Sequence, residues 1–249
     1  MWVALIVSIG VLLGLRMAAP FDVFFSNLFF REVQCVEGSD REICGYFPLT
    51  YQPFWIFVRE VGHALPRILM LAVVIHFIWI LVFNNSKTLA QMYPPLIAIF
   101  TALLGPIFIV NVVLKENWGR PRPWQTTSFG GEHPFVLPGD ITSYCDTNCS
   151  FVSGEASAAF WMLILCLYFT GRKRINVAVF TMIIALGIAF LRVVFGRHYL
   201  SDVVMAGMIN WFVFAFVIWL VQVPLVQVWI AGWHCFSNSH AIGRKGKKI

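Results

Sequence analysis

Long apolar runs alternate with shorter polar segments along the whole chain. A bilayer core of about 30 Å requires about 20 apolar residues in a helix, and six runs reach or approach that length. We therefore predict six membrane-spanning helices, at Trp2–Ala19, Ala64–Phe83, Pro94–Leu114, Phe151–Phe169, Asn176–Phe195 and Val203–Ile230. The first run has no basic segment before it, and Arg16 stands where a signal peptide would be cleaved, so we expect this helix to be retained.

The segment after the first run has a helical pattern of its own. Its apolar residues share one helix face: Phe21, Phe24, Phe25, Leu28 and Phe29. Its polar residues take the opposite face: Asp22, Ser26 and Asn27. Such a helix is expected to lie in the outer membrane interface, with phenyl rings toward acyl chains and polar groups toward water. Packing against the helical bundle is the alternative.

Composition supports the same class of protein. Apolar residues make up 59% of the chain, charged residues only 12%, and the mean hydropathy is +0.77. These values exclude an ordinary soluble domain and indicate a polytopic membrane protein. The chain shows no repeat and no low-complexity linker. We predict an all-α fold with a single domain, residues 1–249, built as a six-helix transmembrane bundle with an interfacial helix on its outer face.

Basic residues predict the orientation. The connection Arg172–Arg174 and the tail 244–248 are rich in Lys and Arg, which favours the cytoplasmic side for both. Both chain termini are then cytoplasmic, as is the connection Asn84–Tyr93. The outer loops are Pro20–His63, Lys115–Ser150 and Gly196–Asp202. The net charge of +6 reflects this topology and contact with anionic lipid, not nucleic acid. The outer loops then lie on the side of the membrane away from the cytoplasm.

Four cysteines fall in the predicted outer loops: Cys35, Cys44, Cys145 and Cys149. Two local disulfides, Cys35–Cys44 and Cys145–Cys149, suit an oxidising compartment such as the periplasm. Free thiols are the alternative, because the sequence does not decide the pairing.

Three polar clusters, distant in sequence, are predicted to share one membrane depth. They are Lys115–Trp124 (KENWGRPRPW), Phe151–Ser157 (FVSGEAS) and Arg192–Asp202 (RVVFGRHYLSD). Ionisable groups beside hydrocarbon are costly, so their convergence at the outer end of the bundle predicts a functional site.

The first residues of each cluster suit a phosphate. Lys115 offers a compact charge, and the guanidinium groups of Arg122 and Arg192 can each donate two N–H bonds to phosphate oxygens. Ser153 and Gly154 open a predicted helix, whose unpaired N–H groups and dipole favour an anion.

His198 and Asp202 suggest the reaction. At i, i+4 on one helix, the carboxylate would accept one imidazole N–H and leave the other nitrogen as a nucleophile toward phosphorus. The product would be a phosphohistidine that water hydrolyses. The cations can stabilise the developing charge, so neither a metal nor another cofactor is required.

The motifs Lys115-x6-Arg122-Pro123, Ser153-Gly154 and Arg192-x5-His198-x3-Asp202, in this order, resemble the signature of the type 2 phosphatidic acid phosphatase (PAP2) superfamily. The resemblance covers the third to the sixth predicted helix and implies an integral-membrane lipid phosphatase with an outward-facing site. It implies attack by His198, orientation of His198 by Asp202, and phosphate binding by Lys115, Arg122, Ser153, Gly154 and Arg192.

Two motifs depart from the family pattern. The usual Pro-Ser-Gly-His is here Val152-Ser153-Gly154-Glu155, and the usual Ser before Arg192 is Leu191. We expect Glu155 to protonate the leaving alkoxide as the general acid; a carboxylate that only complements the helix dipole is the alternative.

The Ser-Gly-Glu variant, the paired loop cysteines and the long outer loop resemble the bacterial lipid A phosphatases. The expected enzyme is a metal-independent phosphoric monoester hydrolase that acts on the 4′-phosphate of lipid A. Phosphatidylglycerophosphate, phosphatidic acid and undecaprenyl pyrophosphate are alternative substrates, and phosphoryl transfer to another lipid is an alternative reaction. An anion transporter is disfavoured, because transporter sites lie near the midplane. The lipid substrate and the membrane are the expected partners, with no nucleic acid and no obligate protein partner.

Other charges in the outer segments keep two interpretations. Arg120 and Arg197 either contact a second phosphate or headgroup or are solvated loop charges. Arg59, Glu60, His63 and Arg67 either line a headgroup pocket or form structural ion pairs. Trp118 and Trp124 are predicted to be residues of the aromatic belt at the interface, with platforms for the substrate as the alternative.

Overall fold

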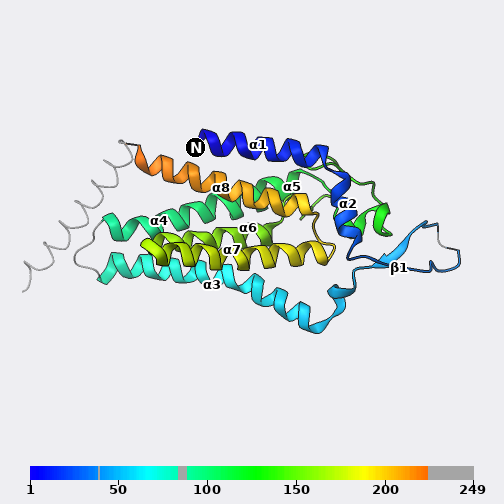
Figure 1. The fold of residues 1–249 in the computed structure, drawn as a ribbon, viewed down its shortest axis with the longest axis horizontal. Coiled ribbons are helices and arrows are strands. Elements are labelled where there is room, and N and C mark those ends of the chain that lie inside the picture. Colours follow the sequence, from blue (N-terminus) through cyan, green and yellow to red (C-terminus); the bar gives the residue numbers. More distant parts are fainter. Residues whose placement is uncertain (39, 84–88, 224–249) are drawn as a thin grey trace, which may run out of the picture.

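The structure, a computed structural model, describes residues 1–38, 40–83 and 89–223, and its regular elements are nearly all helical. The longer helices lie side by side along the long axis of the molecule, with loops and a β-hairpin gathered at one end (Figure 1). The helices are α1 (Trp2–Met17), α2 (Pro20–Asn27), α3 (Pro53–Phe83), α4 (Leu89–Ala102), the π-helical segment η2 (Leu103–Leu114), α5 (Lys115–Asn117), α6 (Gly154–Trp161), the 3-10 segment η5 (Met162–Tyr168), α7 (Gly171–Val194) and α8 (Leu200–Gln222). The predicted all-α membrane fold is confirmed.

The predicted number of six spans is not confirmed. Among the described residues, four helices are long and apolar enough to cross a membrane: Pro53–Phe83, Gln91–Asn117, Gly171–Val194 and Leu200–Gln222. Helices α1 and α2 add a fifth if they are counted as one span bent by 71°. The stretch Gly154–Tyr168 is apolar but shorter, and its second half is the 3-10 segment η5. A 3-10 helix rises about 2.0 Å per residue, more than an α-helix, which partly offsets the short length.

The predicted start of the second span differs most from the structure. Helix α3 begins at Pro53, not at Ala64, because its first turns contain charged residues that hydropathy alone excludes from a span. Helix α8 is described to Gln222, so residues 224–230 of the sixth predicted span lie outside the described residues, as do residues 84–88 of the connection Asn84–Tyr93 and the basic tail.

The short helix α6 lies inside the bundle, in contact with α3, η2, α7 and α8. Its Ala156, Ser157 and Ala159 side chains are fully buried. Small side chains allow neighbouring helix backbones to approach closely, which is how membrane helices pack without a strong hydrophobic driving force.

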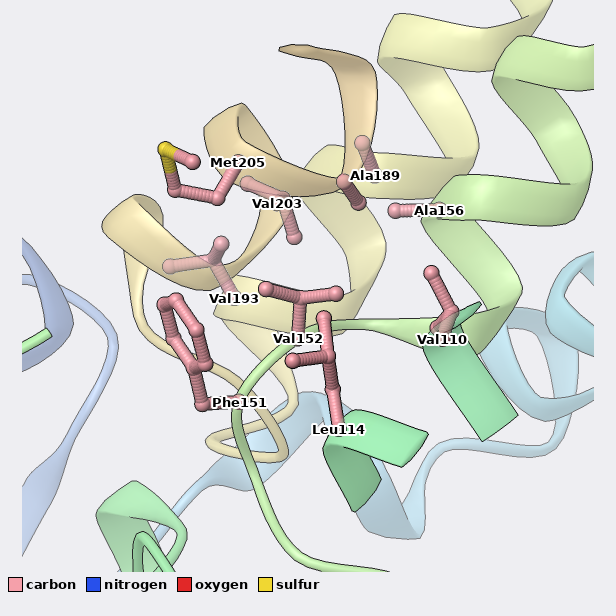
Figure 2. Close-up of a cluster of buried hydrophobic side chains, with 10 residues drawn as sticks. Val110, Leu114, Phe151, Val152, Ala156, Ala189, Val193, Val203 and Met205 are labelled. Carbon is pink, nitrogen blue, oxygen red and sulfur yellow. The ribbon is translucent and has the colours of Figure 1, made fainter. Parts of the chain in front are cut away.

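A cluster of buried apolar side chains from η2, the segment before α6, α7 and α8 forms a core directly beneath the polar clusters. Figure 2 shows that these side chains point toward one another: Val110, Leu114, Phe151, Val152, Ala156, Ala189, Val193, Val203 and Met205. Several are sequence neighbours of predicted site residues, because Leu114 precedes Lys115 and Val193 follows Arg192. Packing of this core therefore fixes the backbone that carries the site.

The loop end of the bundle is held together by a hairpin, three 3-10 turns and two disulfides. Strand β1 (Arg31–Val33) pairs antiparallel with β2 (Cys44–Tyr46), with Arg31 opposite Tyr46. The turns are η1 (Pro48–Tyr51), η3 (Pro123–Gln125) and η4 (Thr127–Phe129). The disulfides Cys35–Cys44 and Cys145–Cys149 are both formed, which confirms the predicted pairing.

Helix α2 is amphipathic as predicted, but the expectation that its polar face meets water is wrong for Asp22 and Ser26, whereas Asn27 is exposed. Asp22 and Ser26 are 4% and 0% exposed, whereas Phe21, Phe24 and Leu28 are at least half exposed. The polar face packs against the bundle because Asp22 finds charged and hydrogen-bonding partners there. The apolar face is left on the outside of the molecule, where a membrane would place lipid.

Candidate active site

The three predicted clusters meet at the loop end of the bundle. Lys115 ends the long apolar helix, Gly154 begins α6, and Arg192 lies in the last turn of α7. A Cβ atom on Gly154 would lie 2.6 Å from Asn111 Oδ1 and 3.4 Å from Lys115 Nζ. Because glycine has no Cβ atom, the start of α6 can approach the Lys115 ammonium group.

Asn148 brings the first two cations together. Lys115 Nζ donates to Asn148 Oδ1 at 2.8 Å, and Arg122 Nη2 donates to the Asn148 carbonyl oxygen at 2.7 Å. Asn148 lies within the loop closed by the Cys145–Cys149 disulfide. Burial lowers the pKa of Arg122, and the neighbouring Arg197 lowers it further. Lys115 and Arg122 are thus held close together by neutral oxygens of this loop, and such a pair of cations suits an anion.

Arg192 is buried and is short of hydrogen-bond partners. Its Nη1 lies 3.3 Å from Glu155 Oε1, and Arg59 Nη2 donates to the same oxygen at 2.8 Å. Within the described part of the chain, Arg192 Nε and Nη1 donate no hydrogen bond, and Glu155 Oε2 accepts none. Buried donors without acceptors are costly, so this arrangement favours the binding of an additional anion.

Glu155 therefore contacts two guanidinium groups. Such contacts favour the carboxylate over the protonated acid, which weighs against the predicted role as general acid. The role stays a prediction. Arg59, whose position had two interpretations in the sequence, belongs to the site through Glu155 and also pairs with Glu60 at 2.9 Å.

The first turn of α6 is capped by Ser153. Its Oγ accepts from the N–H of Ala156 at 3.3 Å, and its own backbone N–H faces the Asp202 carbonyl oxygen at 3.4 Å. The remaining N–H groups at the start of a helix have no partner within the helix. Ser153 therefore orients the helix start that the sequence predicted to receive an anion.

The i, i+4 spacing had predicted that His198 and Asp202 share one helix, but His198 lies outside α8. It belongs to the turn before α8, where Gly196 adopts a left-handed conformation with φ of 62°. The Nδ1 atom lies 2.8 Å from the Ser150 carbonyl oxygen and 3.7 Å from Asp202 Oδ2. The predicted direct hydrogen bond is therefore wrong, and the backbone of Ser150 is the acceptor.

Asp202 supports this arrangement from behind. Its Oδ2 accepts from Ser150 Oγ at 2.6 Å and from the Tyr199 N–H at 2.9 Å. Burial lowers the pKa of His198 to about 4, although Asp202 acts in the opposite direction. The imidazole is thus neutral at neutral pH. Because Nδ1–H donates to the Ser150 carbonyl, the lone pair of Nε2 is free of protein partners in the described residues.

Sequence reasoning missed Arg120, which is neither a solvated charge nor a headgroup contact. The residue is 0% exposed. It donates to Asp202 Oδ1 at 2.5 Å, to Asp22 Oδ2 at 2.9 Å, to Ser201 Oγ at 2.9 Å and to the Val136 carbonyl oxygen at 3.0 Å. A single acidic residue on the otherwise apolar or neutral helix α2 was the available signal that a buried cation is present. Arg120 links α2 to the aspartate behind His198.

The described residues contain no group of three His, Cys, Asp or Glu side chains that could hold a metal ion. The charged groups at the site are instead dominated by cations. This electrostatic balance suits a phosphate group.

Residues 94–224 match the PAP2 superfamily. The chain belongs to this superfamily. Among PAP2 relatives, it is 40% identical over 204 residues to a lipid A 4′-phosphatase of Rhizobium leguminosarum, an alignment that covers 78% of this chain and 84% of the relative. A lipid A 4′-phosphatase of Rhizobium etli is 36% identical over 198 residues, or 78% of this chain and 76% of the relative. One of Francisella tularensis subsp. novicida is 40% identical over 117 residues, or 45% and 53% of the two chains.

The PAP2 fold is also found by comparison with solved structures. The crystal structure of a transmembrane PAP2-type phosphatidylglycerolphosphate phosphatase from Bacillus subtilis matches with a TM-score of 0.54 and 19% identity. The match covers 88% of this chain and 94% of that chain. The predicted superfamily and its enzyme class, a phosphoric monoester hydrolase of membranes, are thus confirmed. The roles of individual site residues stay predictions.

Proposed function

We propose that this PAP2 enzyme removes the 4′-phosphate of lipid A at the outer face of a bacterial inner membrane. The observation that carries the proposal is the buried guanidinium group of Arg192, whose Nε and Nη1 donate no hydrogen bond to the described residues, beside a neutral, oriented His198. Curated relatives named lipid A 4′-phosphatase support the choice of substrate. No cofactor takes part in the proposed reaction.

The substrate phosphate would bind to Lys115, Arg122 and Arg192 and to the N-terminal N–H groups of α6, in competition with Asn148 for the first two cations. His198 Nε2 attacks phosphorus, the bond between phosphorus and the ester oxygen breaks, and the leaving oxygen takes a proton from the general acid, the role expected of Glu155, or from water. Water then attacks the phosphohistidine, which releases inorganic phosphate and restores the imidazole. The cations stabilise the charge that develops in both steps.

The two disulfides support an outward-facing site. The loop of Cys145–Cys149 contacts Lys115 and Arg122 through Asn148, so this disulfide lies at the same end of the bundle as the catalytic groups. Disulfides persist in oxidising compartments such as the periplasm. The basic connection Arg172–Arg174 lies at the opposite end of α7 from Arg192, as expected for a cytoplasmic connection.

The test uses purified protein in detergent with EDTA, incubated separately with lipid A and with phosphatidylglycerophosphate. Released phosphate is measured for the wild type, for His198→Ala and for the matched control His76→Ala, whose histidine stacks on Trp79 in α3. We expect release from lipid A that requires His198 and not His76. With labelled substrate, the wild type should form an acid-labile phosphoenzyme, and His198→Ala should not. Release that persists in His198→Ala refutes the mechanism, and faster release from phosphatidylglycerophosphate refutes the substrate.

A further inference from the structure

A cavity of about 330 Å³ opens beside the loop that carries His198. We call it the aromatic pocket. It is lined by side chains from the hairpin and from η1, η3, η4 and the loop of His198, among them Arg41, Tyr46, Tyr51, Trp124, Phe129 and Arg197. Tyr51 and Trp124 are 71% and 45% exposed, so their rings present apolar faces to whatever enters.

The walls of the aromatic pocket are tied to the loop that carries His198. The backbone N–H of Trp124 donates to the Gly196 carbonyl oxygen at 3.3 Å, and Thr50 Oγ1 donates to the Phe195 carbonyl oxygen at 3.3 Å. A Cβ atom on Gly196 would lie 2.3 Å from the Phe47 ring, so that ring packs directly on the backbone of this loop. The pocket and the catalytic loop are therefore one structural unit, in which a ligand can touch both.

The pocket holds a cation with no acidic partner. The Arg197 guanidinium lies 5.5 Å from the centre of the Trp124 ring, and it makes no hydrogen bond or ion pair with any residue that the structure describes. Arg41, by contrast, pairs with Glu132 at 3.1 Å. Arg197 directly precedes His198 in the chain, so an anion bound to it can belong to the same headgroup as the reacting phosphate. Arginine presents several N–H donors that match a phosphate or a carboxylate.

We propose that the aromatic pocket binds the saccharide of the substrate headgroup and that Arg197 pairs with an anionic group on that saccharide, separate from the phosphate attacked by His198. The inference rests on the proposed function. Aromatic rings beside a few placed polar groups form the usual lining of a small-ligand site, and rings such as Tyr and Trp match the mixed apolar and hydroxylated faces of a sugar. A glycerol headgroup offers no ring to cover these aromatic faces.

The test compares three substrates: lipid A with phosphates at both ends of its disaccharide, lipid A with the 4′-phosphate alone, and phosphatidic acid, which has no sugar. The kcat/KM of each is measured for the wild type, for Arg197→Gln and for Trp124→Leu. Arg31→Gln is the matched control, because Arg31 lies on the exposed strand β1 and does not line the pocket. Thermal unfolding verifies that each variant is folded.

We expect Arg197→Gln to lower the ratio of kcat/KM for doubly phosphorylated lipid A to that for the 4′-phosphate form at least ten-fold. Trp124→Leu should lower the ratio of either lipid A to phosphatidic acid, also at least ten-fold. If both variants change all three substrates by the same factor, the pocket is not a headgroup site, although the proposed function stands. If the wild type hydrolyses phosphatidic acid and neither form of lipid A, the proposed function and this inference both fail.

Discussion

Replacing Arg120 by methionine would leave two buried carboxylates without their cation. Arg120 lies 2.9 Å from Asp22 and 2.5 Å from Asp202, and both aspartates are almost inaccessible to solvent. Breaking a buried ion pair by removal of one partner costs about 3–5 kcal/mol. Because two pairs break here, we expect the free energy of unfolding to fall by about 5 kcal/mol for Arg120→Met. Arg120→Lys keeps the charge but loses the fork of donors, so its loss should be smaller.

A double-mutant cycle with Asp22→Asn separates this electrostatic effect from simple loss of packing. In the wild type, Asp22→Asn removes an ion pair and should destabilise the protein. In the Arg120→Met variant, the same change relieves repulsion between Asp22 and Asp202 and should stabilise it. Unfolding of purified protein in detergent measures both effects. If the changes in unfolding free energy of the two single variants add up to that of the double variant within about 0.5 kcal/mol, the residues do not interact and the reasoning is refuted.

Replacement of Arg120 should also lower the catalytic rate, because Arg120 contacts Asp202. Arg120 holds Oδ1 of Asp202, while Oδ2 accepts from Ser150, whose carbonyl oxygen in turn accepts from His198. Folded Arg120→Lys protein should therefore lose kcat, with little change in KM, because the cations proposed to bind the phosphate are untouched. Arg31→Lys, on the exposed strand β1, is the control and should match the wild type in both stability and kcat.

Three further predictions concern the catalytic groups and their support. If Glu155 is the general acid, Glu155→Gln lowers kcat by about 10²–10⁴-fold; if it is only the counter-ion of Arg59 and Arg192, kcat stays within a few-fold and inhibition by inorganic phosphate strengthens. Protonation of His198 removes its nucleophilic lone pair as the pH falls, and burial lowers its pKa to about 4. The kcat/KM, expressed per phosphate dianion, should therefore stay constant down to about pH 5. A fall in kcat/KM near the ordinary histidine pKa of about 6.5 would contradict this. Joint replacement of Cys145 and Cys149 by serine should cost about 2 kcal/mol of unfolding free energy and raise KM by releasing Asn148, whereas Cys166→Ser, at a free cysteine, should change neither.

Much of the architecture was predictable because it depends on local composition. A bilayer imposes a minimum apolar length on each span, and the helices of α3, α7 and α8 follow from that rule alone. The chemistry was predictable for a different reason. Lysine, arginine and histidine have few uses at the end of an apolar helix, so Lys115, Arg192 and His198 in a fixed order pointed to a phosphate site before any contact was known.

The contacts that organise the site depended on the tertiary structure. Arg120 and Asp22 are separated by 98 positions, and Ser201 and Asp22 by 179. Hydropathy identifies the polar face of α2, but whether that face meets water or protein depends on what the rest of the chain places beside it. In a membrane, a carboxylate is driven toward a buried cation because lipid offers it no alternative.

The acceptor for His198 shows the same limit. A spacing of i, i+4 implies contact only if both residues lie on one helix, and the left-handed turn at Gly196 ends α7 so that α8 starts after His198. The carbonyl group of Ser150, 48 positions earlier, takes the place that the spacing had given to Asp202. The sequence by itself determined the spans of α3, α7 and α8 and the superfamily, and it predicted the reacting groups, since each of these depends on residue type and local order. Tertiary structure decided which groups pair, because hydrogen bonds and ion pairs act over a few ångströms in space, whatever the distance along the chain.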